Sequence, residues 1–146
     1  MRQSIARIRP KIHDRQLLLN TFLFLCLVRL GLRFLPFQTL QKRLAQRSQI
    51  SRHTPEPLSI GKIVWAIDTA TRYMPGGVKC LARALVTQTM MKQHGHSGEL
   101  RIGVAKGQTG ELEAHAWVEH RGRVVIGYLS DLQRYVPMPS FHGSRL

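Results

Sequence analysis

The chain has 146 residues, of which 43% are hydrophobic, and it carries a formal net charge of +14. A chain of this length is expected to form one compact domain, and the ordinary composition excludes a low-complexity or disulfide-rich protein. Its two cysteines, Cys26 and Cys80, lie in unlike surroundings, which favours a reducing compartment. The start lacks the apolar segment and small-residue cleavage site of a signal peptide, so we expect a cytoplasmic protein.

The positive charge is concentrated toward the start of the chain. Residues 1–56 contain eleven Lys or Arg against two acids, a net charge of +9, whereas residues 57–146 contain eleven against six. An excess of this size favours anionic partners: nucleic acid, an acidic lipid surface, or an acidic peptide or protein. A general solubility bias explains it equally well, so the charge alone identifies no partner.

The first expected element is a long helix from Asp14, a suitable cap, to about Pro36, whose ring ends it. Its apolar run, Leu17 to Val28, is shorter than the roughly 20 residues that span a bilayer. Arg29 and Arg33 follow on one helical face, where they can meet phosphate headgroups or an acidic partner. A packed amphipathic helix is the first interpretation, followed by interfacial membrane contact and then by a spanning helix.

A boundary is expected near the middle of the first half of the chain. A second basic helix is predicted over residues 37–47, and a linker with serine and proline over residues 48–57. This linker divides the chain into a basic helical arm, residues 1–57, and a catalytic core, residues 58–146.

Two helices and then three strands are expected after the boundary. Isoleucines at helical spacing predict a helix over residues 58–73, and a second helix over residues 79–93 follows the Pro75-Gly76-Gly77 turn. The apolar period then changes to two, which predicts strands over residues 100–104, 112–119 and 123–127. Helices followed by an antiparallel meander predict an α+β fold.

Cys80 is the first candidate for chemistry, because it begins the predicted helix directly after a glycine turn. The first turn of a helix has free N–H groups and a positive potential that stabilise a thiolate, and Lys79 adds a cation. The same N–H groups can hold the oxyanion of a tetrahedral intermediate. A buried structural cysteine is the alternative.

His115 is the candidate base. It lies in the middle of a strand between two alanines, which gives an imidazole a rigid mount and room to face a cleft. A cysteine at a helix start followed by a strand histidine is the order of papain-like sites, where an acid or amide orients the imidazole. An ordinary exposed or core histidine is the alternative.

Three blocks of the sequence carry a family resemblance. They are CLARAL at residues 80–85, GELRIGV at 98–104 and AHAWVE at 114–119. In this order and spacing they resemble the transglutaminase-like leader peptidases of lasso-peptide biosynthesis, similar to the C-terminal domain of the microcin-processing protein, over roughly residues 60–139. The resemblance implies a papain/transglutaminase-like cysteine peptidase core, with helices packed on a small antiparallel sheet, an N-terminal helical arm, and no cofactor.

The resemblance also implies roles and partners. In that family the cysteine attacks the peptide bond between the leader and core of a precursor peptide, and the histidine activates it, so Cys80 is the implied nucleophile and His115 the implied base. A separate leader-recognition protein delivers the precursor in trans, and an ATP-dependent macrolactam cyclase then closes the ring. The basic arm is a candidate docking place for the recognition protein.

The third catalytic residue departs from the family pattern. The family places an acid near the position of Gly127, which offers no carboxylate. Asp131 lies four residues further on and is the candidate that orients His115, although a backbone carbonyl can serve the same role. A helix cap and a solvated surface charge are the alternatives for Asp131.

Other functions are consistent with parts of the sequence. A transglutaminase-like transferase would use the same residues. The absence of an acid at Gly127 is also consistent with a non-catalytic relative that only binds peptides. A basic module that contacts nucleic acid or an acidic membrane through residues 1–52 is the rival from another class, with peripheral membrane contact favoured over nucleic acid. His94 and His96 lack the spacing of zinc ligands, so we expect loop histidines and no metal site.

Overall fold

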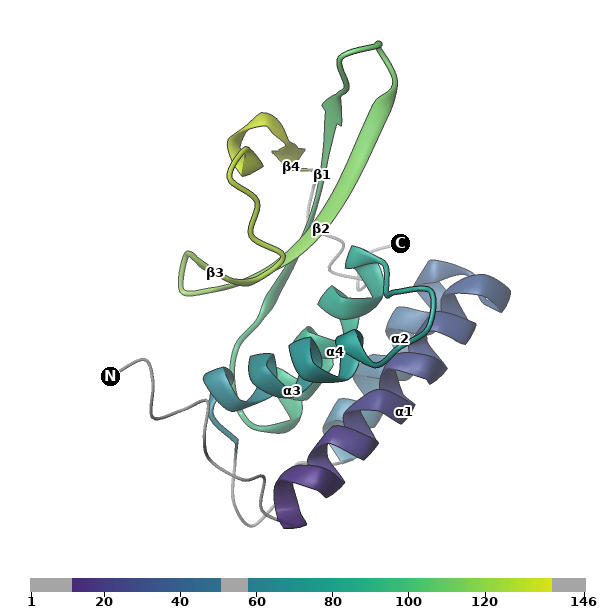
Figure 1. The fold of residues 1–146 in the computed structure, drawn as a ribbon, viewed down its shortest axis with the longest axis vertical. Coiled ribbons are helices and arrows are strands. Elements are labelled where there is room, and N and C mark those ends of the chain that lie inside the picture. Colours follow the sequence, from purple (N-terminus) through teal and green to yellow (C-terminus); the bar gives the residue numbers. More distant parts are fainter. Residues whose placement is uncertain (1–11, 51–57, 138–146) are drawn as a thin grey trace.

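The structure of the chain, a computed structural model, describes residues 12–50 and 58–137. The described residues form helices followed by a small antiparallel sheet, which confirms the predicted α+β class. The elements are α1 (Ile12–Phe34), α2 (Phe37–Ile50), α3 (Ile60–Arg72), α4 (Cys80–Gln93), β1 (Glu99–Lys106), β2 (Leu112–His120), β3 (Arg123–Ile126), η2 (Leu132–Arg134) and β4 (Val136–Pro137). Figure 1 shows the helices gathered together and the β1–β2 hairpin projecting beyond them.

Both N-terminal helices extend past their predicted bounds. α1 begins two residues before Asp14, which therefore lies in the first turn rather than at the cap and pairs with Lys62 of α3 at 2.6 Å. A carboxylate in this turn suits the positive end of the helix. α2 continues to Ile50, so the predicted linker is wrong over residues 48–50, where no proline or glycine stops the helix. Residues 51–57 of that linker lie outside the described residues.

α3 follows from a local cap and from the spacing of its apolar residues. The Ser59 side chain accepts a hydrogen bond from the Lys62 backbone N–H at 3.2 Å, which satisfies one of the free donors at the helix start. Ile63, Ile67 and Ala70 recur at helical spacing and are buried, as their periodicity predicts.

The helices and the sheet share one core. Its largest fully buried apolar side chains come from α1, α3, α4 and β2, and they are Leu25, Val28, Ile63, Ile67, Leu85, Val86, Met91 and Val118. α2 adds Leu40 and Leu44 to the same cluster. The two helices of the predicted arm are therefore packed on α3 and α4, and the predicted boundary at residue 57 lies outside the described residues and stays a prediction.

The sheet has the strand order β3-β2-β1-β4. The predicted meander is present, because β1 pairs with β2 and β2 pairs with β3, all antiparallel. β4 was not expected from the sequence: it joins the free edge of β1, where Val136 pairs with Val104. A strand of two residues is too short to show a period of two, so only the long-range pairing defines it.

The two faces of the sheet are covered by different parts of the chain. Ala116 and Val118 of β2 face α4 and belong to the helical core. Trp117 lies between them in sequence and faces the other way, into a small second cluster with Ala105 and Tyr135. In Figure 1 the segment after β3, coloured yellow-green, lies beside the β1–β2 ribbon and away from the helices. We call this side of the sheet the outer face.

His94 and His96 bind the backbone of Leu58, just before the start of α3. The Leu58 backbone N–H donates to Nδ1 of His94 at 3.1 Å, and Nε2 of His96 donates to the Leu58 carbonyl at 2.6 Å. Burial, together with the neighbouring His96, lowers the pKa of His94 below its ordinary value. The two histidines, expected to be loop residues, thus fix the start of α3 against the end of α4.

Candidate active site

Cys80 is the first residue of α4, as the sequence predicts. The turn before it contains Gly76 and Gly77, whose φ angles of 78° and 73° lie in the left-handed region that glycine enters freely. Lys79 is the N-cap residue, with extended backbone and no capping hydrogen bond from its side chain. The helix therefore begins at Cys80 with an open end.

The open end of α4 leaves backbone donors without partners in the helix. The first intrahelical hydrogen bond runs from the Arg83 N–H to the Lys79 carbonyl at 3.2 Å, so the N–H groups of Cys80, Leu81 and Ala82 precede it. These donors and the helix dipole favour negative charge at this point. The arrangement suits both a thiolate on Cys80 and an oxyanion beside it.

The surroundings of Cys80 are partly apolar. Its side chain is half-buried and packs against the helical core, and its thiol makes no hydrogen bond to any residue that the structure describes. The helix that Cys80 begins packs against β2 of the sheet.

His115 is held in one orientation on the outer face. Its Nε2 lies 2.6 Å from the carbonyl oxygen of Gly127. A carbonyl only accepts hydrogen bonds, so Nε2 carries the proton and, in the neutral ring, Nδ1 is the unprotonated nitrogen. The ring stacks on Trp117, with centroids 6.1 Å apart, and meets Tyr135 at 5.7 Å. The nitrogen left free to act as a base is therefore Nδ1.

Gly127 can supply this carbonyl because it has no side chain. Its φ is 87°, and a Cβ built there would lie 2.8 Å from the Ala116 carbonyl oxygen and 2.8 Å from Cβ of Trp117. Real Cβ atoms essentially never come this close to backbone, so any larger residue requires the chain to move. The position where the family resemblance places an acid is thus occupied by a backbone acceptor. Sequence reasoning allowed a backbone carbonyl in this role but did not identify which one, because only the folded chain shows the direction of a carbonyl.

The structure does not join Cys80 and His115 directly. The His115 ring lies on the outer face, whereas the adjacent Ala116 faces the helices, and no hydrogen bond connects the thiol with the ring. β3 pairs with β2 only from Val118 onward, and the next residue along the chain, Gly127, lies against Ala116 and Trp117 of β2. The predicted Cys80–His115 pair stays a prediction.

Asp131 lies just before η2, in the segment that covers the outer face. Its carboxylate is 3.1 Å from Nη2 of Arg134, and it makes no hydrogen bond to His115 in the described part of the chain. Arg134 also pairs with Glu113 at 2.9 Å. The orienting role predicted for Asp131 stays a prediction, and the acceptor on His115 Nε2 is the Gly127 carbonyl.

The two glutamates that share the strand face of His115 have partners of their own. Glu119 accepts a hydrogen bond from the indole N–H of Trp117 at 2.9 Å. Glu113 accepts from Arg134 and from the hydroxyl of Tyr135 at 3.3 Å. Burial and the nearby Glu113 carboxylate raise the pKa of Tyr135, so this hydroxyl is a donor at neutral pH. These contacts hold Trp117 and Tyr135 against the His115 ring.

A second ion pair lies one turn into α4. Arg83 pairs with Asp68 of α3, so the arginine that follows Cys80 is tied to the neighbouring helix rather than free to face a cleft. Its two partners are fifteen residues apart, and no local pattern in the sequence indicates the pairing. The contact joins α3 to the beginning of α4 and so supports the Cys80 end of the helix.

Comparison with known proteins identifies the family. A sequence model described as the transglutaminase-like superfamily matches residues 22–140, which is most of the chain. The chain belongs to the transglutaminase-like superfamily. No match was found among curated proteins or among solved structures.

The family supports cysteine peptidase or transferase chemistry for this transglutaminase-like protein. The match extends from α1 to the end of the described sheet and includes Cys80, His115 and Asp131, but it contains nothing specific to lasso-peptide leader peptidases. In the described residues no group of three or more His, Cys, Asp or Glu side chains is arranged to hold a metal ion.

Proposed function

We propose that this transglutaminase-like protein is a cysteine peptidase that removes the leader peptide from a lasso-peptide precursor in the cytoplasm. The observation that carries the proposal is the position of Cys80 at the open, uncapped start of α4, within a chain of this superfamily. The substrate class rests on the resemblance of residues 80–85, 98–104 and 114–119 to the leader peptidases.

The proposed reaction is acyl transfer with water as the final acceptor. Nδ1 of His115 takes the proton of the Cys80 thiol, and the thiolate attacks the carbonyl carbon of the bond between leader and core. The free N–H groups at the start of α4 stabilise the oxyanion. The protonated ring then gives its proton to the leaving amine of the core peptide, which leaves the leader as a thioester on Cys80. Water activated by His115 hydrolyses the thioester and restores the thiol.

The carbonyl of Gly127 orients the base in this scheme. By accepting the Nε2 proton it keeps Nδ1 free, which is the role that a carboxylate or amide has in related sites. The scheme requires the thiol and the ring to come together, because they make no hydrogen bond in the structure. Catalytic hydrogen bonds are often long before the substrate is bound.

The proposed partners follow from the substrate. A leader-recognition protein is expected to deliver the precursor in trans, and an ATP-dependent macrolactam cyclase is expected to close the ring on the released amine. Release of a free amino end on the core peptide is the step that such a cyclase needs, since a macrolactam is an amide made from that amine.

Cleavage of a precursor tests the proposal directly. The purified chain, a candidate precursor and its leader-recognition protein are mixed, and the products are followed by mass spectrometry. Cys80→Ala and His115→Ala should each reduce cleavage to background, a loss of about 10³-fold or more. Cys26→Ala is the matched control, because Cys26 is a half-buried free thiol in α1.

The products separate the proposal from its rivals. Two fragments whose masses sum to that of precursor plus water support hydrolysis, whereas a cross-linked product indicates a transferase. Normal cleavage by the Cys80→Ala variant would show that another nucleophile acts and would end the proposed mechanism.

A further inference from the structure

The solvent-facing side of α1 is apolar. Its exposed large side chains are Leu19, Leu23, Leu27, Leu30 and Phe34, with 58%, 51%, 57%, 54% and 74% of their surface accessible. Their spacing of four, four, three and four residues places them on one face of the helix. We call this set the leucine stripe. Along a helix with about 1.5 Å rise per residue it extends for about 22 Å.

The opposite side of α1 is packed in the protein core. Thr21, Leu25 and Val28 are almost fully buried against the other helices. A helix that covers a soluble core normally presents polar residues to water, and a continuous exposed apolar patch marks an interaction site. α1 is apolar on both sides, so the leucine stripe requires a second covering.

The helix is long and apolar enough over Asp14–Phe34 to cross a membrane by length and composition. A crossing helix would have to withdraw Leu25 and Val28 from the core they share with α3 and α4, and would uncover those helices. A helix that keeps this packing can instead lie in the plane of an interface, with only its outer side in the apolar layer. The packing therefore favours surface contact over spanning.

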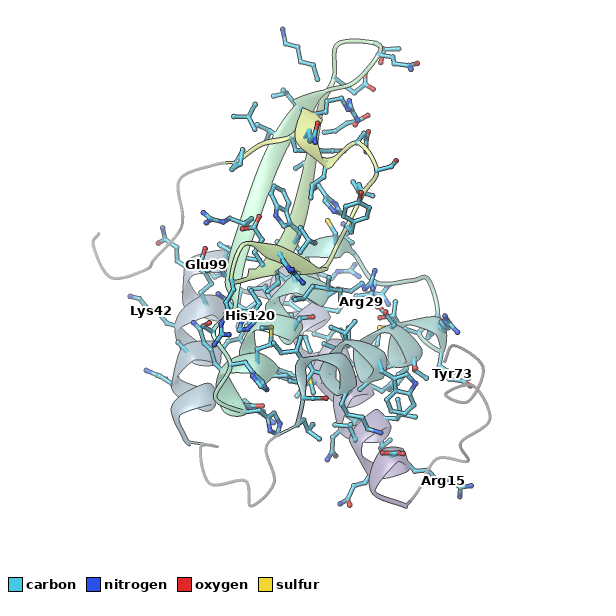
Figure 2. All side chains as sticks on the ribbon, turned by 90° about the vertical axis from the view of Figure 1, so that its left-hand side faces the viewer. Arg15, Arg29, Lys42, Tyr73, Glu99 and His120 are labelled. Carbon is cyan, nitrogen blue, oxygen red and sulfur yellow. The ribbon has the colours of Figure 1, made fainter. Side chains whose placement is uncertain are left out.

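The charges around the stripe identify the kind of surface. α1 carries three exposed arginines, Arg15, Arg29 and Arg33. Arg29 donates to the Pro75 carbonyl oxygen at 3.0 Å, whereas Arg15 and Arg33 lie three or four residues from members of the stripe. The single acid of α1, Asp14, is paired with Lys62. Figure 2 shows Arg15 extending outward from α1. Apolar side chains bordered by cations fit an anionic lipid surface.

The same charges argue against a second copy of this chain as the covering. Pairing two leucine stripes would bring together two segments that each carry a net charge of +9 over residues 1–56. Like charges of this size repel across an interface, whereas acidic headgroups attract them. We propose that α1 lies in the surface of an anionic lipid bilayer, with the leucine stripe in the acyl boundary and the neighbouring arginines among the headgroups.

Vesicle binding tests this proposal with the full chain. Co-sedimentation is measured with vesicles of phosphatidylcholine alone and with vesicles that contain phosphatidylglycerol. We expect binding to the anionic vesicles to be about tenfold tighter or more, and to fall as salt is raised. Equal binding to both kinds of vesicle, or binding to neither, would overturn the proposal.

Two pairs of substitutions separate the apolar and the charged contributions. Leu23→Gln with Leu27→Gln should weaken partition into anionic vesicles by about tenfold or more, because both side chains leave the acyl boundary. Arg15→Gln with Arg33→Gln should also weaken it by about tenfold and reduce its salt dependence. Leu112→Gln is the matched control, since Leu112 is 74% exposed at the start of β2 and is expected to leave binding unchanged. Circular dichroism confirms that each variant is folded.

Two further outcomes would show that the leucine stripe is covered by a second copy of the chain, or that α1 spans the bilayer. A dimer in lipid-free solution that Leu23→Gln with Leu27→Gln dissociates would show that a second copy covers it and would overturn the proposal. Resistance of the bound chain to alkaline carbonate extraction would indicate spanning and would overturn the interfacial position. None of these measurements uses the precursor peptide, so vesicle binding and the proposed cleavage succeed or fail separately.

Discussion

The two faces of the sheet differ in what covers them and in what they can do. The helical face carries Ala116 and Val118 against α4 in the main core. The outer face carries His115 and Trp117 beneath a short segment that contains η2. One face is a dry packing surface, and the other holds an imidazole in a fixed orientation with few covering residues. The division between the faces is therefore one of stability: the helical face belongs to the main core, against which Cys80 also packs, whereas the outer face fixes the ring of His115.

The largest effect on stability is expected from the main core, which lies on the helical side of the sheet. Leu25→Ala removes a fully buried side chain from the main core and should lower the free energy of unfolding by about 2–5 kcal/mol. Leu132→Ala on the outer face removes a partly buried side chain and should cost about 1 kcal/mol. Chemical denaturation measures both. Equal losses would contradict the division between the faces.

The next effect is expected at Gly127, where the outer face meets the candidate site. Gly127→Ala places a Cβ against the Ala116 carbonyl and should cost about 1–3 kcal/mol of stability. It should also reduce precursor cleavage by about 10–100-fold and change its pH profile, because the acceptor on His115 moves.

Gly110→Ala is the matched control for Gly127→Ala. Gly110 has a similar φ of 89°, but nothing lies within 4 Å of a Cβ built there. The Gly110→Ala variant measures the loss of stability caused by a left-handed backbone alone, without the contact between the new Cβ and the Ala116 carbonyl. If the two variants cleave the precursor equally well, the Gly127 carbonyl has no positioning role.

A smaller, pH-dependent effect is expected at His94. Its pKa lies below the ordinary value of 6.5, and its Nδ1 accepts the Leu58 N–H, which a protonated ring cannot do. The unfolded chain therefore binds the proton more readily, so the contribution of His94 is fully present above about pH 6.5 and is lost as the pH falls through its lowered pKa. The free energy of unfolding is measured against pH. His94→Asn keeps an acceptor that does not titrate, and it should flatten the curve; an unchanged slope would contradict this assignment.

The smallest effect is expected at Asp131. Asp131→Ala removes an exposed partner of Arg134 and should change stability by less than about 1 kcal/mol. If Asp131 helps to orient His115, cleavage should weaken, but by less than in Gly127→Ala, because the His115 Nε2 acceptor is the Gly127 carbonyl. Cleavage assays on the two variants compare them, and a greater loss in Asp131→Ala would reverse their order.

Much of the fold was predictable because it depends on local pattern. The isoleucines of α3, the glycine turn before Cys80 and the alternation of β2 each act over a few residues, and the structure has these elements within a few residues of the predicted bounds. The end of α2 and the strand β4 were missed. The first lacks a stop signal in the sequence, and the second exists only through pairing with a distant strand.

The candidate site was predictable in its residues but not in its geometry. Cys80 lies at the helix start because glycine flexibility and helix-end chemistry are local properties. The acceptor on His115 is a backbone carbonyl twelve residues away, and a backbone atom leaves no mark in the sequence. The sequence therefore directed attention to the carboxylate of Asp131, which the structure pairs with Arg134.

By itself the sequence determined the order of the four helices and the first three strands, the cysteine at a helix start and the concentration of positive charge in the first third of the chain. The tertiary structure alone decided which face of β2 holds His115, which atom orients its ring, and that the leucine stripe of α1 faces outward while Leu25 and Val28 face inward. The physical reason is distance along the chain. Caps, turns and periods are set by near neighbours, whereas the exposure of a face depends on what packs against it.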